Sequence, residues 1–191
     1  MKALRQHIKP GVVYRRSDLE YFSTAIDRHL AQLVQEGVLT RFSQGLYYSP
    51  QVSKFGILPP DDNQWIERFL KDDDFLILSP NSFNALGLGL TQLYNTTWVY
   101  NHKRKGEFKL NGKTLEFKLK SAYPSKVTRE FLLVELLNNM DELVEIPTLD
   151  RISNKFNEFD IISLLKMAQT YGSGKCKKIL KSLVRKEKIY A

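Results

Sequence analysis

The sequence predicts an α+β fold, in which a small helical segment with a hairpin precedes a mixed α/β segment that ends in helices. An amphipathic run over residues 23–37 leads directly into two short β-prone runs. Farther along, alternating runs at 106–110 and 114–119 flank Asn111-Gly112, a pair typical of a tight hairpin turn. From residue 125 onward the spacing of apolar residues is helical. We expect helices at 125–140, 148–157, 159–170 and 173–188.

Composition excludes several classes of protein. Hydrophobic residues make up 42% of the 191 residues, which is enough to fill a core. No apolar run approaches the roughly 18–20 residues of a membrane span, so we expect no membrane contact. Residues 1–10 lack the apolar centre of a signal peptide, so we expect a cytoplasmic protein.

The cysteine and histidine content gives no sign of a metal centre. Cys176 is the only cysteine, which excludes an intramolecular disulfide and a cysteine-based zinc cluster. The three histidines, His7, His29 and His102, are far apart and have no second ligand at metal-binding spacing. We therefore expect no metal and no cofactor.

Charge is distributed in alternating blocks. The chain carries a formal net charge of +8 and has a pI near 9.5. Residues 1–56 hold 8 basic and 4 acidic residues, residues 103–129 hold 9 and 2, and residues 173–191 hold 7 and 1. The two intervening segments are acidic. This pattern favours a polyanionic partner for the basic blocks and a different role for the remaining surface.

The first 22 residues predict two short helices around a strand. Leu4 and Ile8 lie one helical turn apart, and Pro10-Gly11 ends that helix. Val12–Tyr14 is β-prone, and Ser17 with Glu20 has the form of a capping box that opens a helix to about Phe22.

The run at 23–37 predicts the helix that matters most for function. Its apolar residues recur at helical spacing, Ser23 or Thr24 supplies the N-cap, and Gly37 ends the helix. The following segment, 38–50, predicts a hairpin that turns at Ser43-Gln44-Gly45. A hairpin directly after such a helix is typical of the wing in a winged helix-turn-helix, so we expect this fold over residues 1–56.

A winged helix of this kind favours a double-stranded DNA partner, although such folds also serve as protein-interaction modules. We expect the second helix to present base-reading side chains and the hairpin to reach phosphates or a minor groove. The base-reading candidates are Thr24, Asp27, Arg28 and Gln32. The phosphate or wing candidates are Arg15, Arg16, Arg41, Ser43, Gln44 and Lys54.

Residues 57–191 predict a second, α+β domain. The segment 54–60 ends in Pro59-Pro60 and is expected to be an extended link. Asp61 or Asp62 is expected to cap a helix that carries Trp65, and Phe75–Leu78 to form a buried strand. A capped helix through Leu86 and a strand over 96–100 follow. In the later hairpin we expect core positions at Phe108, Leu110, Leu115, Phe117 and Leu119, and solvated ones at Lys109, Lys113, Lys118 and Lys120.

No motif supports catalysis, so we expect a non-enzyme. The carboxylates of 61–62 and 72–74 lack a nucleotidyltransferase signature and are typical of caps and turns. Gly172-Ser173-Gly174-Lys175 lacks the full phosphate-loop pattern and a preceding strand. Cys176, in a lysine-rich segment, is a candidate for a thiol of lowered pKa, without other signs of a catalytic setting.

The C-terminal domain carries a candidate for a second basic surface. Three alternatives remain open for it: a solvated helix face, a second DNA-contacting surface, or a site for an acidic protein partner. Its candidate residues are Lys103, Arg104, Lys105, Lys177, Lys178, Lys181 and Arg185.

The run from Leu30 to Pro50 resembles the N-terminal domain of the AbiEi-like family, the antitoxins of type IV (abortive-infection) toxin–antitoxin systems, and related winged-helix regulators of unknown function. A second stretch, from Pro59-Pro60 to Gln92, extends the resemblance to about residues 12–120. The residues that match are Leu30, Leu33, Gly37, Leu39, Arg41, Gly45, Tyr47, Ser79, Pro80, Asn84, Ala85, Leu86, Gly87, Leu88, Thr91 and Gln92.

The resemblance implies a regulator that represses its own operon at an operator, expected to be an inverted repeat. It also implies a C-terminal domain that opposes a nucleotidyltransferase-like toxin. Two other functions remain open. One is a stand-alone winged-helix transcription factor whose C-terminal domain dimerises or senses a ligand. The other is a metal-dependent enzyme that acts on nucleic acid.

Overall fold

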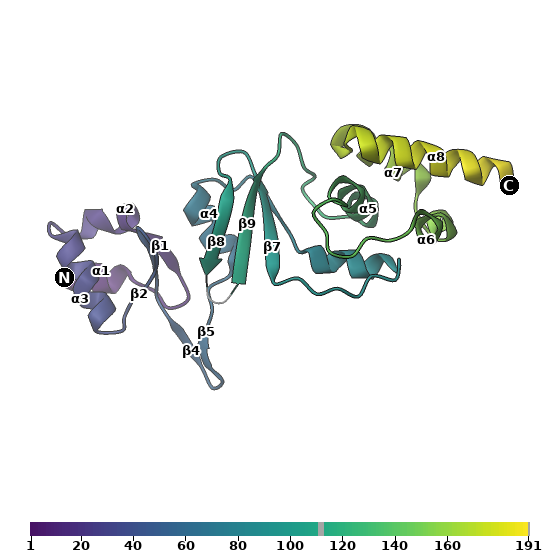
Figure 1. Cartoon of the computed structure of the whole chain (residues 1–191). Helices are drawn as coiled ribbons and strands as arrows, with labels where there is room; N and C mark the ends of the chain where they lie inside the picture. Colours follow the sequence, from purple (N-terminus) through teal and green to yellow (C-terminus); the bar gives the residue numbers. More distant parts are fainter. Residues whose placement is uncertain (111–112, 191) are drawn as a thin grey trace. The chain divides into compact units, whose positions relative to one another are not determined.

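The computed structural model confirms a mixed α+β fold with small sheets, 45% helix and 20% strand. It describes the backbone of residues 1–110 and 113–190. It also describes the side chains of these residues, except those of Leu110 and of residues 186–190. The predicted Asn111-Gly112 turn and the side chain of Leu110 lie outside the described part. Two compact units make up the chain, one built largely from Met1–Phe75 and the other from Leu76 onward (Figure 1).

Helices and a small antiparallel sheet form the first unit. The strands lie in the order β1-β3-β2. Its core is mostly aliphatic, with Leu4, Leu30 and Leu33 fully buried, and also includes Tyr14 of the sheet. The elements up to residue 48 are α1 (Lys2–His7), β1 (Val13–Arg15), α2 (Arg16–Leu19), the 3₁₀ helix η1 (Glu20–Phe22), α3 (Ile26–Gln35), β2 (Thr40–Ser43) and β3 (Leu46–Tyr48).

The structure corrects both predicted N-caps in this region. Helix α2 begins directly after strand β1, so Arg15 is its N-cap residue, and the Arg15 N–H donates to Asp18 Oδ2 at 3.0 Å. The predicted box of Ser17 and Glu20 is therefore wrong, and the Glu20 carboxylate instead binds Arg16. Helix α3 begins at Ile26 with Ala25 as N-cap, because the Ser23 hydroxyl accepts from the Ala25 N–H outside the helix.

The predicted hairpin after α3 is confirmed. Arg41 pairs with Tyr47 and Ser43 with Leu46, with a register shift between the two pairs. Gly45 turns the chain with φ of +74°, a conformation that other residues adopt at a cost. Gly37 has the same φ at the end of α3, as predicted.

A second hairpin, β4 (Gln51–Ser53) and β5 (Gly56–Leu58), replaces the predicted extended link. The Ser53 hydroxyl closes its turn by accepting from the Phe55 N–H and donating to the Gly56 carbonyl. Helix α4 (Asp62–Leu70) follows, and Asp61 caps it by accepting from the Gln64 N–H at 3.0 Å, as predicted.

Helix α4 belongs to the first compact unit. Gln64 Oε1 accepts from the Val13 N–H at 2.7 Å. The Trp65 ring lies 5.4 Å from the ring of Phe42 in β2, measured between centroids. The unit therefore extends to Phe75, past the predicted limit at residue 56.

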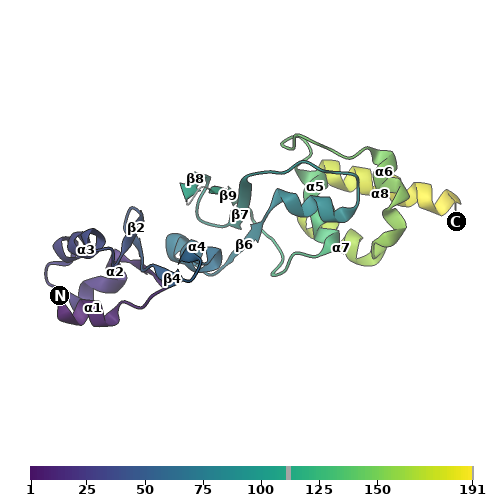
Figure 2. The same cartoon turned by 90° about the horizontal axis from the view of Figure 1, so that it is seen from below.

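The second unit packs helices with a four-stranded sheet of order β6-β7-β9-β8. Strands β7 and β9 are parallel, with Thr96 opposite Thr114. Helices α5 to α8 lie together (Figure 2). The elements are β6 (Phe75–Leu78), the 3₁₀ helix η2 (Pro80–Leu86), β7 (Thr96–Asn101), β8 (Gly106–Leu110), β9 (Lys113–Leu119), α5 (Arg129–Asn138), α6 (Leu149–Asn154), the 3₁₀ helix η3 (Phe156–Glu158), α7 (Ile161–Tyr171) and α8 (Gly174–Tyr190).

Several details of this unit differ from the prediction. The helix expected from 125 begins at Arg129, because Thr128 caps it by accepting from the Phe131 N–H. Leu119, expected in the core, is 53% exposed at the end of β9. Lys118, expected in water, is only 13% exposed, because its ammonium lies 4.0 Å from the centroid of the Trp98 ring.

A buried carboxylate organises the space between α5 and the sheet. Glu135 is 1% exposed and accepts a hydrogen bond from the Tyr100 hydroxyl. Lys120 Nζ lies 3.2 Å from Glu135 Oε2, and Asn138 Nδ2 donates to Oε1 at 2.8 Å. The carboxylate thus has several donors, as a buried charge requires.

Burial and the adjacent Glu135 carboxylate raise the pKa of the Tyr100 phenol above its usual range. Above about pH 10, an unfolded tyrosine loses its proton while the folded Tyr100 keeps it, so rising pH favours unfolding. We expect the free energy of unfolding to fall by about 1.4 kcal/mol more per pH unit in the wild type than in Tyr100→Phe. Urea unfolding between pH 9 and 11 measures this difference. The expectation would be contradicted if the free energy of unfolding fell with pH at the same rate in both proteins.

Candidate nucleic-acid interface

One face of α3 is exposed to solvent, and it is the face that the sequence predicted. The helix buries Ile26, Leu30 and Leu33 against the core of the first unit. The four predicted base-reading residues, Thr24, Asp27, Arg28 and Gln32, are all exposed on α3 or immediately before it.

Asp27 does not stand alone on this face, because it forms a two-point ion pair with Arg16 of α2. Arg16 Nε lies 2.7 Å from Asp27 Oδ1, and the second contact joins Arg16 to Oδ2 at 2.9 Å. The hydrogen bond to Arg16 lowers the pKa of Asp27, and the hydrogen bond to Asp27 raises the pKa of Arg16. Arg16 also binds Glu20. The Arg16–Asp27 pair connects α2 to α3, and it engages two of the side chains that were predicted to contact DNA.

Arg28 and Arg41 are the predicted contacts that stay available. Both are exposed, one on α3 and the other on β2. Neither forms an ion pair with any residue that the structure describes. Gln44, also exposed, occupies the turn of the same hairpin. Two unpaired guanidinium groups and a free amide suit contacts to phosphates and base edges.

Three other residues that were predicted to contact DNA are hydrogen-bonded within the protein or have a buried polar atom. Arg15 Nε donates to the Arg68 carbonyl at 2.6 Å and so caps the C-terminal end of α4. Gln32 Nε2 donates to Glu36 Oε1 at 2.9 Å. The Ser43 hydroxyl oxygen is buried without a hydrogen-bond partner. Arg15 and Ser43 are therefore not freely exposed, whereas Gln32 is exposed but hydrogen-bonded within α3 and its C-cap residue.

Lys54 lies on the β4–β5 hairpin, which extends away from α1 and α3 within the first unit (Figure 1). Its ammonium lies 5.7 Å from the centroid of the Phe55 ring, which is 90% exposed. This hairpin was not predicted from the sequence. The signal for it was the β-prone pair Gln51–Ser53 and Gly56–Leu58 around a Lys-Phe turn, which the following prolines outweighed.

The predicted second basic surface is spread over two elements of the second unit. The β7–β8 loop carries the first three cations, and the buried Asn101 shapes it by accepting from the N–H groups of Lys103 and Arg104. Helix α8 carries the other four. All seven side chains are exposed. They are Lys103, Arg104, Lys105, Lys177, Lys178, Lys181 and Arg185.

The structure assigns local roles to the groups considered for chemistry. Burial raises the pKa of the Cys176 thiol to about 12, which corrects the expectation of a lowered value. Ser173 caps α8 by accepting from the Cys176 N–H at 3.2 Å, and Lys175 Nζ pairs with Asp141 at 2.6 Å. Asp72 accepts from the Asp74 N–H in a turn. Within the described residues, no three His, Cys, Asp or Glu side chains form a metal-binding group.

No family model matches the chain, and no curated protein or solved structure compared with it is similar. In the part of the chain that the structure describes, each helix is too short or too polar to cross a membrane.

Proposed function

We propose that the first unit is a winged helix-turn-helix that binds double-stranded DNA, and that the protein is a transcriptional regulator. The order of its elements supports this: α2 and the 3₁₀ helix η1 precede α3, β2 and β3 form a hairpin directly after α3, and β1 completes the sheet on β3. The observation that carries the proposal is the polar, exposed face of α3 followed by this hairpin. Such folds place the second helix in the major groove.

The free side chains define how the unit docks. Thr24 lies just before α3 and Arg28 in its first turn, the end of the helix that in this class of fold contacts base edges. A guanidinium such as that of Arg28 pairs with two acceptors of guanine. Arg41 and Gln44 on the β2–β3 hairpin contact the phosphate backbone. Asp27 and Arg16 act together to hold α3 against α2.

The regulatory role that we propose rests on the resemblance to AbiEi-like antitoxins. In it, the protein represses its own operon through an inverted-repeat operator and opposes a nucleotidyltransferase-like toxin. The exposed cations of the first unit support the DNA-binding half of this role. Co-expression with the product of a neighbouring nucleotidyltransferase-like gene tests the other half, because the protein should relieve the toxicity of that product.

Substituting the two unpaired arginines should weaken DNA binding. Arg28→Ala removes a base contact, and we expect about a tenfold loss of affinity. Arg41→Ala removes a phosphate contact, so the slope of log K against log salt should fall by about one. Fluorescence anisotropy with a labelled duplex from the region upstream of the chain's own gene, at moderate salt, measures both effects.

Lys166→Ala is the matched control, since Lys166 is an exposed cation on α7 of the second unit. It removes the same charge and should leave binding within about twofold of wild type. If Arg28→Ala and Arg41→Ala bind as the wild type does, or if Lys166→Ala loses as much, the docking of α3 is wrong.

A further inference from the structure

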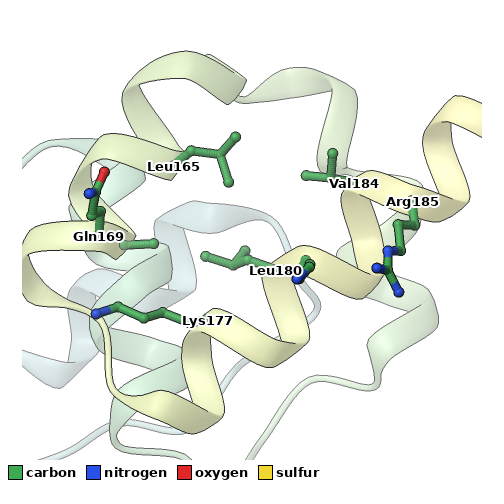
Figure 3. A pocket seen from close by; sticks show the side chains of 8 residues that line it. Leu165, Gln169, Lys177, Leu180, Val184 and Arg185 are labelled. Carbon is green, nitrogen blue, oxygen red and sulfur yellow. The ribbon is translucent and has the colours of Figure 1, made fainter.

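An apolar groove lies between α7 and α8 of the second unit. It encloses about 460 Å³, which is within the usual range for ligand sites. Figure 3 shows Leu165 and Gln169 on one helix and Leu180 and Val184 on the other, with the two leucines turned toward each other. Ala168 completes the lining on the α7 side. Leu165 is 43% exposed, so an aliphatic surface remains open to solvent here.

Three cations border this apolar surface along α8. Lys177, Lys181 and Arg185 line the groove and follow each other at intervals of four residues. They therefore form one row along the helix, with about 6 Å between neighbours. All three are exposed, and none has an ion pair among the described residues. Among the side chains that the structure describes, those lining the groove include no acidic one.

Helix α7 extends the apolar side of the groove. Ile162 lies one turn before Leu165 on the same side of α7, and it is 82% exposed. The surface therefore has an aliphatic edge on α7, an aliphatic floor, and a cationic edge on α8. An exposed arrangement of this kind marks an interaction site.

We propose that this groove binds an acidic amphipathic helix of a partner protein. The apolar stripe of such a helix covers the leucines, and its carboxylates, repeated every four residues, face the cation row at matching spacing. A nucleic-acid backbone supplies anions but no apolar surface for Leu165 and Leu180. An amphiphile with one head group meets only one of the three cations. The proposal does not depend on DNA binding by the first unit.

A designed peptide tests the proposal on the full-length protein. The probe is a fluorescein-labelled 16-residue helix with leucines along one face and glutamates every fourth residue beside them. A scrambled peptide of the same composition, in which the stripe is lost, is the control probe. We expect the amphipathic peptide to bind with a Kd on the order of 10 μM at physiological salt and the scrambled peptide at least about tenfold more weakly.

Two variants and one matched control locate the site. Lys181→Glu reverses the middle charge of the row, and Leu165→Asp places a carboxylate on the apolar edge; each should weaken binding about tenfold or more. Lys178→Glu makes the same charge change on an exposed residue of α8 that does not line the groove, so it should stay within about threefold. Circular dichroism checks that each variant is folded, and Lys177→Gln is a milder second test of the row.

Four outcomes would overturn the proposal. The first is that Lys178→Glu weakens binding as much as Lys181→Glu does, and the second is that the scrambled peptide binds as tightly as the amphipathic one. Either result would mean that the peptide binds by non-specific charge attraction to the protein. The third is that an unlabelled DNA duplex displaces the peptide from the wild-type protein and binds the Leu165→Asp variant more weakly. This result would mean that the groove binds nucleic acid. The fourth is that light scattering finds a dimer that Leu165→Asp dissociates, which means that a second copy covers the groove.

Discussion

Trp65→Ala is expected to lower the free energy of unfolding of the first unit by about 3–5 kcal/mol. The Trp65 side chain is 1% exposed, and its ring lies near Phe42 of β2 and Phe69 of α4. Removing the indole leaves a cavity between α4 and the small sheet, and the packed surroundings fill it only in part. The loss should destabilise all of Met1–Phe75, because α4 is part of that unit.

Hydrogen exchange followed by mass spectrometry measures this effect unit by unit. Peptides from α1, α3 and β3 should exchange faster in Trp65→Ala, and those from α5 and α7 should not change. Phe55→Ala is the matched control, because this aromatic side chain is 90% exposed and its loss should cost less than about 0.5 kcal/mol. If only α4 exchanges faster in Trp65→Ala, then α4 is not a structural part of the first unit.

Glu135→Ala is expected to destabilise the second unit by about 3–5 kcal/mol. The substitution removes the acceptor of the Tyr100 hydroxyl and of two asparagine side chains, and it leaves the Lys120 ammonium without its counter-ion. Lys120 Nζ also lies 4.7 Å from the centroid of the Tyr100 ring. Lys120 and Tyr100 therefore lie side by side, and both lose Glu135 as their partner. Unsatisfied groups inside a protein cost more than the original bonds contribute.

Urea unfolding followed by tryptophan fluorescence in a Trp65→Phe background measures this loss, since the remaining Trp98 lies in the sheet of the same unit. Glu135→Gln keeps hydrogen-bonding capacity without the charge, so its free energy of unfolding should lie between those of Glu135→Ala and the wild type. Glu158→Ala is the control: Glu158 binds Arg129 and Lys155 near the surface, and such exposed pairs contribute under about 1 kcal/mol. Equal effects of Glu135→Ala and Glu158→Ala would show that burial of Glu135 is not what makes it important.

Local signals in the sequence predicted much of the fold. Gly45 marked the β2–β3 turn, Asp61 marked the start of α4, and the alternating pattern after residue 105 marked β8 and β9. These signals act over a few residues, so they can be recognised without knowledge of the tertiary structure. The predicted exposed face of α3 depended on the same kind of periodicity.

Tertiary contacts decided what the sequence could not predict. Arg15 was a candidate phosphate contact, but the carbonyls that it caps belong to Arg68 and its neighbour, more than fifty residues away. Arg16 and Asp27 pair because α2 and α3 fold against each other. Lys118 is covered because β9 lies beside Trp98 of β7, in a parallel pairing that no local pattern indicates.

The groove between α7 and α8 shows the same limit. Basic residues of α8 were visible in the sequence, with three alternatives open for their role. Only the packing of α7 beside α8 places Leu165 and Leu180 next to the row of Lys177, Lys181 and Arg185. The apolar surface then favours an acidic protein partner over nucleic acid at this site.

A nitrogen–proton NMR titration of the full-length protein with the upstream DNA duplex tests the central claim most directly, because it shows which residues the DNA contacts. The predicted result is a set of shifted amides in α3 and the β2–β3 hairpin, including Thr24, Arg28, Arg41 and Gln44, and losses of these shifts in Arg28→Ala. Amides of α8 should stay unchanged. Shifts confined to α8 or to the β7–β8 loop, with α3 unaffected, would contradict DNA binding by the first unit.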